Sequence, residues 1–502
     1  MKNHHSLYAG LLLASFSAVA LSTPAHADQR DDRIKALEQK LDALVGEIKS
    51  LKQEQTTDKV DNQTLTNQVI DLKRGQAAAL ADVQTQKAAT PQLGFANGRP
   101  TFTSADGKSS VSIRSLLQYD VTHFAQNGRA ATSTDLNSGS NFRRARIGIE
   151  GKVVGDWTYS FLYDLGGSGT EASALSDAYI QYDGFGAIKL RTGAFATPQG
   201  IEDQTSAGDL IFQERNAPAD LARSIAGSDG RKNVLSVFAQ GDDYFAAATW
   251  SLARAQEAAV FDQQQAAVGR LSYRVFKDQD TNLILSASGS YVFKIADTAV
   301  SPAGASALTF QSRLENTVDG TRLISAGAVN ARKAHVWGVE TAGNWKNLYG
   351  QAGYFGYGIS RRASTLPNPS FDGWYAQGTW VLTGESRRYN TATASFQTPR
   401  PAAPFDFKGK GLGAWELTAR YSVLDLNYRP GNAGAAVVAA TGGIRGGKQE
   451  GYTAGINWYP NSVLRFLVNY EHQDIERLAA AAPFKDIGQK VDILTARAQL
   501  AF

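Results

Sequence analysis

The sequence predicts an all-β transmembrane barrel of about 16 antiparallel strands, preceded by an α-helical coiled coil. Three observations lead to this prediction. The chain begins with a segment that has the features of a secretory signal peptide. Residues 109–502 consist of short runs in which apolar and polar residues alternate, and the last run ends at Phe502. Residues 31–87 carry an apolar repeat of 3.5 residues, which is typical of coiled coils.

Residues 1–27 are expected to be a cleavable signal peptide. Lys2 precedes an apolar core from Leu7 to Leu21, and Ala25-His26-Ala27 has the small-x-small pattern that signal peptidase cuts. The alternative is a membrane anchor, but the apolar run is short and a strongly polar segment follows it. We therefore expect an exported protein that loses these residues.

The composition limits the classes of function. The 502 residues include 48 glycines, 10% aromatic residues and no cysteine, and the formal net charge is +4. The absence of cysteine excludes a disulfide framework, and the small net charge gives no support for binding nucleic acid. No two histidines outside the signal have the spacing of metal ligands. We expect no metal, no cofactor, no nucleic-acid partner and no enzymatic activity. These histidines are His123, His335 and His472.

Residues 28–90 are predicted to form a coiled coil. The first three heptads of the 31–87 repeat are apolar at both seam positions, and a single helix cannot bury such a seam. We therefore expect a homo-oligomer, and a single solvated helix that frays after Leu51 is the alternative. Asn62 falls on the seam and would fix the register of the helices. The seam of the first heptads comprises Ile34, Leu37, Leu41, Leu44, Ile48 and Leu51.

Residues 91–108 are predicted to be a linker, because prolines and glycines interrupt any regular pattern there. Residues 109–502 are predicted to form the barrel. An even number of strands is what a closed up-and-down barrel requires when both chain ends lie on one side. The sixteen predicted strands are 109–124, 141–154, 157–165, 175–182, 188–195, 233–241, 244–253, 266–276, 282–293, 333–342, 347–359, 371–382, 414–424, 448–458, 463–473 and 493–502.

Asn141–Glu150 illustrates the alternation of the predicted strands. Ile147 and Ile149 fall on one face, whereas Arg144, Arg146 and Glu150 fall on the other. In a membrane barrel the apolar face contacts lipid and the charged face lines a wet lumen. A soluble β-sandwich would also alternate, but it needs no C-terminal aromatic residue. A final strand ending in Phe502 resembles the segment by which the barrel-assembly machinery recognises outer-membrane proteins.

The connections between strands are short or long in turn. Residues 155–156, 241–243 and 460–462 are expected to be periplasmic turns, because barrels have short turns on that side. Segment 196–232 is expected to fold into the lumen and narrow it, and an ordinary exposed loop is the alternative. The connections expected to be extracellular loops or inserts are 125–140, 196–232, 294–332, 383–413, 425–447 and 474–492.

Several motifs resemble those of the phosphate-selective porin O and P family over about residues 109–502. They are Phe142-Arg143-Arg144-Ala145, Gly155-Asp156-Trp157, Tyr163-Asp164-Leu165, Glu214-Arg215-Asn216, Leu382-Thr383-Gly384-Glu385, Gly413-Ala414-Trp415-Glu416-Leu417 and Gly455-Ile456-Asn457-Trp458-Tyr459. The resemblance implies a trimeric, 16-stranded channel of the bacterial outer membrane, with an inward loop and basic residues that bind anions. The coiled coil would then lie in the periplasm.

The resemblance assigns Arg143 and Arg144 to the constriction and Arg215 to the inward loop. On alternation, Arg114 and Arg146 belong to the same lumen face, so these five arginines are the candidate anion contacts. Glu202 and Asp203 are the candidate residues that modify selectivity. Asp203 occupies a position where phosphate-specific members have a basic residue, so it would weaken anion binding or pair with an arginine.

The favoured function is therefore passive diffusion of small hydrophilic solutes through an outer-membrane porin biased to anions such as phosphate. Guanidinium groups stay charged and bind oxyanions with two donors, which suits this role. One alternative is a porin for another solute, such as a sugar or a dicarboxylate. Another is a structural tether, in which the coiled coil binds peptidoglycan. For Arg143 and Arg144 themselves, the alternative to a role in permeation is a lattice of ion pairs that only stiffens the barrel.

Overall fold

The computed structural model divides into two compact units, residues 1–88 and 89–502. The predicted signal peptide lies outside the described residues except for Ala27. The described residues are 27–54, 62–88, 90–96, 98–126, 134–167, 174–226, 231–255, 262–278, 280–297 and 307–502.

The described part of the first unit consists of the helices α1 (Ala27–Glu54) and α2 (Asn62–Ala88). Both helices are rich in alanine and in straight-chain residues, which lose little side-chain freedom in a helix. The heptad residues Ile34, Leu37 and Leu41 are about half exposed in the single chain. Residues 55–61, across which the sequence predicts a continuous coil, lie outside the described residues. No described helix combines the length and the apolar character that crossing a bilayer requires.

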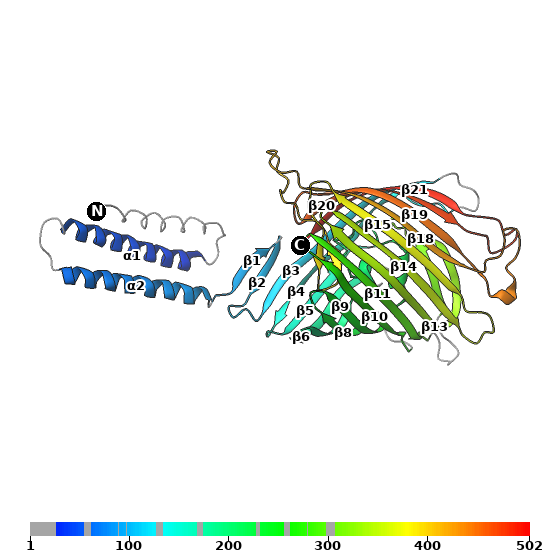
Figure 1. Ribbon diagram of the computed structural model, residues 1–502, viewed down its shortest axis with the longest axis horizontal. Helices are drawn as coiled ribbons and strands as arrows, with labels where there is room; N and C mark the ends of the chain where they lie inside the picture. The colour runs from blue at the N-terminus through cyan, green and yellow to red at the C-terminus, as the bar shows by residue number, and fades with distance from the viewer. Residues whose placement is uncertain are drawn as a thin grey trace. The chain divides into compact units, whose positions relative to one another are not determined.

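The second unit is a closed antiparallel barrel (Figure 1). Its sheet has 19 strands, of which β1, β2 and β12 are additions and the other 16 form a ring in chain order. The ring closes where β21 pairs with β3. The 16 predicted strands are confirmed. They are β3 (Ser110–Gln126), β4 (Gly139–Val153), β5 (Trp157–Asp164), β6 (Ala174–Phe185), β7 (Ile188–Phe195), β8 (Lys232–Gln240), β9 (Tyr244–Arg254), β10 (Gln265–Lys277), β11 (Thr281–Lys294), β13 (Arg322–Trp345), β14 (Leu348–Arg361), β15 (Ser370–Val381), β18 (Ala414–Tyr428), β19 (Ile444–Tyr459), β20 (Leu464–Glu476) and β21 (Gln489–Ala501).

The outer face of the strands is apolar, and the inner face is polar except where it contributes to the apolar core around α4. In β20, Arg465 and Asn469 are buried inside the barrel, whereas Phe466 and Val468 are exposed on the outside. This pattern is the reverse of a soluble sandwich, whose exposed face is polar. Outward tryptophans also gather at one end of the barrel, as expected where aromatic side chains border the membrane. They are Trp157, Trp345, Trp380, Trp415 and Trp458.

The end that carries these tryptophans also carries the short turns 154–156, 241–243 and 460–463. The long connection 382–413, between β15 and β18, joins strands at this same end, because neighbouring strands of the ring alternate in direction. The expectation of an extracellular loop at 383–413 is therefore wrong, whereas the alternative expectation of an insert agrees with the structure. The segment is instead an insertion at the periplasmic end, and part of it forms the hairpin β16 (Arg388–Asn390) and β17 (Ser395–Gln397).

Residues 91–108 contain two strands where the sequence predicts an irregular linker. The strands β1 (Gln92–Ala96) and β2 (Arg99–Thr103) form a hairpin, and β2 extends the barrel sheet by pairing with β3. Gly98 occupies the turn with a φ of +75°, a conformation that other residues rarely adopt. The glycine and proline pattern therefore marks a hairpin turn and its edge strands.

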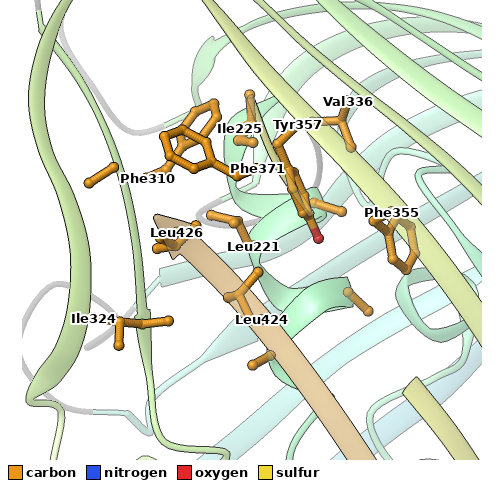
Figure 2. Packing of buried hydrophobic residues seen from close by; sticks show 14 of the residues in the cluster. Leu221, Ile225, Phe310, Ile324, Val336, Phe355, Tyr357, Phe371, Leu424 and Leu426 are labelled. Carbon is orange, nitrogen blue, oxygen red and sulfur yellow. The ribbon is translucent and has the colours of Figure 1, made fainter. Parts of the chain in front are cut away.

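A large apolar core lies inside the barrel, around the helix α4 (Ala217–Ile225) of segment 196–232. Figure 2 shows Leu221 and Ile225 of α4 close to aromatic and aliphatic side chains of the barrel wall and of β12 (Ala307–Arg313). Asn216 caps the helix by accepting a hydrogen bond from the Ala219 N–H. The core residues labelled around α4 include Phe310, Ile324, Val336, Phe355, Tyr357, Phe371, Leu424 and Leu426. This core fixes α4 against the wall.

Removing one polar link to α4 is expected to have a small effect. The Tyr357 hydroxyl donates to the carbonyl oxygen of Pro218 at 2.7 Å, and Tyr357 is almost fully buried. Tyr357→Phe should lower the free energy of unfolding by about 1 kcal/mol, because a buried carbonyl loses its donor. The midpoint of thermal unfolding in detergent measures this loss. Tyr273→Phe, at an exposed outward position, is the control and should leave the midpoint unchanged.

Candidate functional site

Segment 196–226 crosses the barrel interior between β7 and β8. Most of its residues are buried, and they contact the inner faces of strands that lie far apart around the ring. The Gln118 amide of β3 donates to the carbonyl oxygen of Ala207, and the Ile201 N–H donates to the Glu340 carboxylate of β13. We call residues 196–226 the inner loop. Its position across the lumen makes it the candidate constriction of a channel.

Arginines of three C-terminal strands hold the inner loop through its backbone. An irregular buried segment has carbonyl groups without strand or helix partners, and these need donors. The guanidinium fork supplies two or more donors from one side chain. The donors and acceptors are Arg420 to Glu214 O at 2.9 Å, Arg465 to Leu210 O and Ile211 O at 2.5 Å each, and Arg497 to Gln213 O at 2.8 Å.

These three arginines were missed as site residues. The available signal was their position on the predicted strands, since the two-residue alternation places Arg465 and Arg497 on the lumen face. The alternation alone does not tell which inward arginine binds the loop and which faces open water. The contacts decide this, because Arg465 and Arg497 are almost fully buried against the loop.

Glu214 of the inner loop gathers the predicted arginine pair. Its carboxylate accepts two hydrogen bonds from Arg143, at 2.5 and 3.2 Å, and lies 3.6 Å from guanidinium nitrogens of both Arg144 and Arg497. Burial raises the pKa of Glu214, but the Arg143 and Arg144 guanidiniums lower it well below its usual range. Asp120 holds Arg497 from the other side at 2.6 and 2.7 Å.

A β-bulge explains why two consecutive arginines of β4 both point inward. The register with β3 shifts between Gln118 and Tyr119, so Arg143 is the extra residue of the ladder. Arg143 and Arg144 are 8% and 3% exposed. Their guanidiniums therefore bind Glu214 and Gln118 rather than an open water channel.

The remaining predicted loop residues are also engaged with protein groups. Arg215 donates to the carbonyl oxygens of Glu202 and Thr205, both at 2.9 Å, and burial lowers its pKa to about 10. The Glu202 carboxylate accepts from Asn216 and from Gln377 of β15. Asp203 pairs with Arg223 at 3.0 Å. These residues brace the loop, and they do not face an open part of the lumen.

Arg114 and Arg146 differ from the other predicted arginines because they remain partly exposed. Arg146 pairs with Asp164 at 2.6 Å, and Arg114 pairs with Glu150 at 3.1 Å. Both side chains line a cavity of about 420 Å³ at the periplasmic end of the lumen. Six arginines and one aspartate line this cavity: Arg99, Arg114, Arg146, Arg388, Arg400, Arg465 and Asp209.

Two of these arginines come from the 382–413 insertion, which the sequence placed at the wrong end. Among the described residues, neither Arg388 nor Arg400 has a carboxylate partner within 4.0 Å, and the Arg388 Nε–H is buried without an acceptor. The other charged groups of the cavity wall are mostly paired. Arg388 and Arg400 are therefore the cations best placed to meet a solute anion.

Three contacts, two of them buried, fix the insertion inside the barrel. Arg387 forms a two-pronged ion pair with Glu416 of β18, at 2.7 and 2.9 Å. Arg270 of β10 donates to the carbonyl oxygen of Ala394 at 2.6 Å. Thr398 donates to the Asp209 carboxylate of the inner loop through its N–H and its hydroxyl, both at 3.0 Å. The insertion and the inner loop thus meet at Asp209, beside the cavity.

Comparison with known proteins matches residues 111–502 to the model of the family described as "Phosphate-selective porin O and P". Porin O of Pseudomonas aeruginosa is 26% identical over 387 residues, which cover 73% of this chain and 83% of that protein. An uncharacterized protein of Caulobacter vibrioides is 26% identical over 519 aligned positions, covering 98% and 96%.

Solved structures with a similar fold include the anion-selective porin from Comamonas acidovorans, with a TM-score of 0.47, 11% identity and coverage of 78% of this chain and all of that one. The outer membrane channel DcaP of Acinetobacter baumannii has a TM-score of 0.46 and 10% identity, covering 80% and 99%. The family match extends over most of the chain and includes the whole of the closed barrel except its first residue. The chain belongs to the phosphate-selective porin O and P family and is an outer-membrane porin.

Proposed function

We propose that this porin is a passive channel for small hydrophilic solutes and favours anions such as phosphate. The observation that carries the proposal is the cavity at the periplasmic end, where Arg388 and Arg400 have no carboxylate partner within 4.0 Å among the described residues, while Arg99, Arg114 and Arg146 are paired with acids. Asp209 is the one acid among the described residues of the cavity wall, and a single carboxylate cannot cancel the two guanidinium charges; one of its oxygens already accepts two hydrogen bonds from Thr398. In a narrow lumen with low-dielectric walls, unpaired guanidiniums raise the local concentration of anions.

The open cations, rather than the predicted arginine pair, are proposed to set the selectivity. Arg143 and Arg144 are engaged by Glu214 and Gln118, so their net contribution to the field is small. Arg388 and Arg400 lack such partners among the described residues. Weak binding at several exposed cations also permits fast release, which conduction requires.

Single-channel reversal potentials in a KCl gradient test this proposal. The native chain should give the sign of an anion-selective pore. Arg388→Ala combined with Arg400→Ala should lower the chloride-to-potassium permeability ratio several-fold, because two unpaired positive charges leave the lumen wall. Lys485→Ala removes an exposed positive charge from the loop between β20 and β21, outside the cavity, and is the control. A cation-selective native channel would contradict the proposal.

We also propose that three chains assemble and that residues 28–90 form a periplasmic three-stranded coil. The half-exposed apolar seam of α1 supports this, since such a seam needs partner helices. Sedimentation in detergent should give a trimer for the full chain. Deletion of 31–87 should weaken the trimer, and a monomeric full chain would contradict the assembly.

A further inference from the structure

Residues Phe405–Leu412, at the outer edge of the 382–413 insertion, form a narrow projection at the periplasmic end of the barrel, which we call the finger. Asp406 and Gly411 pair across it, and the Gly409 N–H donates to the Asp406 carbonyl oxygen at 3.0 Å. Gly409 has a φ of +78°, which a side chain would strain. The Phe405 N–H donates to the carbonyl oxygen of Pro460 in the 460–463 turn, which fixes the finger to the barrel.

Aromatic contacts continue from the outer face of the barrel onto this finger. The ring of Phe405 lies 5.2 Å from that of Trp458 and 5.0 Å from that of Phe407, measured between centroids. Trp458 in turn stacks on Trp415 at 5.5 Å and on Phe466 at 5.6 Å. Trp415, Trp458 and Phe466 belong to the outward face, so Phe405 and Phe407 extend the apolar exterior beyond the strands.

The tip of the finger combines an uncovered aromatic ring with two lysines. Phe407 is 96% exposed and Leu412 is 65% exposed. Lys408 and Lys410 flank the tip and are also exposed, while Asp406 is turned toward the Lys408 N–H. An aromatic residue beside lysines is the composition found where protein surfaces enter the headgroup region of a bilayer. A basic cluster there attracts anionic headgroups.

We propose that the finger Phe405–Leu412 is a membrane anchor that inserts into the phospholipid leaflet at the periplasmic end of the barrel. Phe407 and Leu412 enter the boundary between headgroups and acyl chains, and Lys408 and Lys410 bind the phosphate groups of anionic phospholipids. The finger continues the outward aromatic face that contacts lipid, and it borders the end marked by Trp415 and Trp458. This inference concerns the lipid surface and goes beyond the proposed solute selectivity.

A lipid partner fits these residues better than a second protein chain. Burying two lysines in a protein interface requires paired acids, since unpaired buried charges are costly. At a bilayer surface the same ammonium groups remain hydrated and reach the phosphates from flexible stems. The finger is also held by its own backbone hydrogen bonds and by the Phe405–Pro460 contact, so its tip loses little conformational freedom on insertion.

Site-specific labelling of the full chain tests the anchor, because the native sequence has no cysteine. Phe407→Cys carries an environment-sensitive fluorophore in vesicles of phosphatidylglycerol or of phosphatidylcholine. Asp242→Cys, at an exposed position on the 241–243 turn of the same end, carries the control label. The label at 407 should show a blue-shifted emission and quenching by spin-labelled lipids. The label at 242 should be quenched by iodide instead.

The lysine contribution is measured on the same labelled chain. In phosphatidylglycerol vesicles the label at 407 should be quenched by lipid more strongly than in phosphatidylcholine, and Lys408→Gln with Lys410→Gln should abolish this difference. The affinity of the finger for anionic headgroups should fall roughly fivefold for each lysine removed. Equal iodide quenching at 407 and 242 would overturn the proposal. So would a label at 407 that both quenchers fail to reach, since that result would indicate a protein partner. Each variant is verified as folded if its unheated sample migrates on a denaturing gel at the same position as the unheated native chain.

Discussion

Glu214→Gln is expected to destabilise the folded barrel by about 3–5 kcal/mol, because it removes the carboxylate that three buried arginines share. Arg143 and Arg144 would lose their acidic partner, whereas Arg497 would keep Asp120. The inner loop would keep its other contacts, which are the backbone hydrogen bonds, the Glu202–Gln377 and Asp209–Thr398 contacts and the apolar core around α4. The midpoint of thermal unfolding in detergent measures the change.

A matched control separates the loss of stability caused by Glu214→Gln from the effect of losing an acidic side chain in general. Asp242→Asn removes an exposed partner of Lys277 and should cost at most about 1 kcal/mol. If Glu214→Gln and Asp242→Asn unfold at the same temperature, Glu214 does not organise the arginines. The same variant should also become more anion-selective, because a negative charge leaves the inner loop.

The cluster should also resist acid. The pKa of Glu214 is lowered in the folded state, so its contribution to stability is fully present above its unfolded pKa of about 4.5. That contribution is lost only as the pH falls through the lower, folded value. The difference in unfolding midpoint between the native chain and Glu214→Gln should therefore be constant from pH 7 to pH 5. A difference that disappears within this interval would contradict the lowered pKa.

Arg387→Met is the second change with a large expected effect. It leaves the Glu416 carboxylate buried without its cation, because the two side chains are 1% and 0% exposed. The expected cost is about 3–5 kcal/mol. Arg387 also donates to the Asp209 carbonyl oxygen at 3.2 Å, so its loss removes one of the contacts between the insertion and the inner loop and loosens the insertion. Single-channel conductance should therefore rise.

A double-mutant cycle distinguishes loss of the ion pair from loss of side-chain packing. Arg387→Met together with Glu416→Gln should be more stable than Arg387→Met alone, because the unpaired charge is gone. Asn457 and Tyr459, which both donate to the Glu416 carboxylate, remain in the double variant as hydrogen-bonding neighbours of the new amide. Additive losses in the cycle would show that Arg387 and Glu416 are not coupled.

The strands could be predicted because a two-residue alternation is a local property of the sequence. It located all 16 barrel strands and the inward faces of Arg144 and Arg146. The extent of β13 was underestimated, since its first half pairs with β12 in an insertion rather than with a barrel neighbour. The hairpin at 91–103 was missed because its short strands contain a proline and flank a glycine, which are signals of a linker as well as of a turn.

The partners of the arginines could not be predicted. Arg143 and Glu214 are 71 residues apart, and Arg387 and Glu416 are joined only because the insertion turns into the barrel. Length identified 383–413 as unusual but did not tell at which end it lies. Counting strands from the predicted N-terminal end would have placed it with the short turns. The unpaired cations Arg388 and Arg400 were missed for the same reason.

The arginine contacts of the inner loop have a consequence for assembly order. Arg465 and Arg497 donate to carbonyl groups that precede them by 255 and 284 residues. Both lie on the last two strands, so the loop is synthesised long before its donors exist. Such non-local contacts form late in folding. The contacts that Arg465 and Arg497 make to the inner loop are therefore completed only when the last two strands close the barrel, so closure also completes the fixing of the loop.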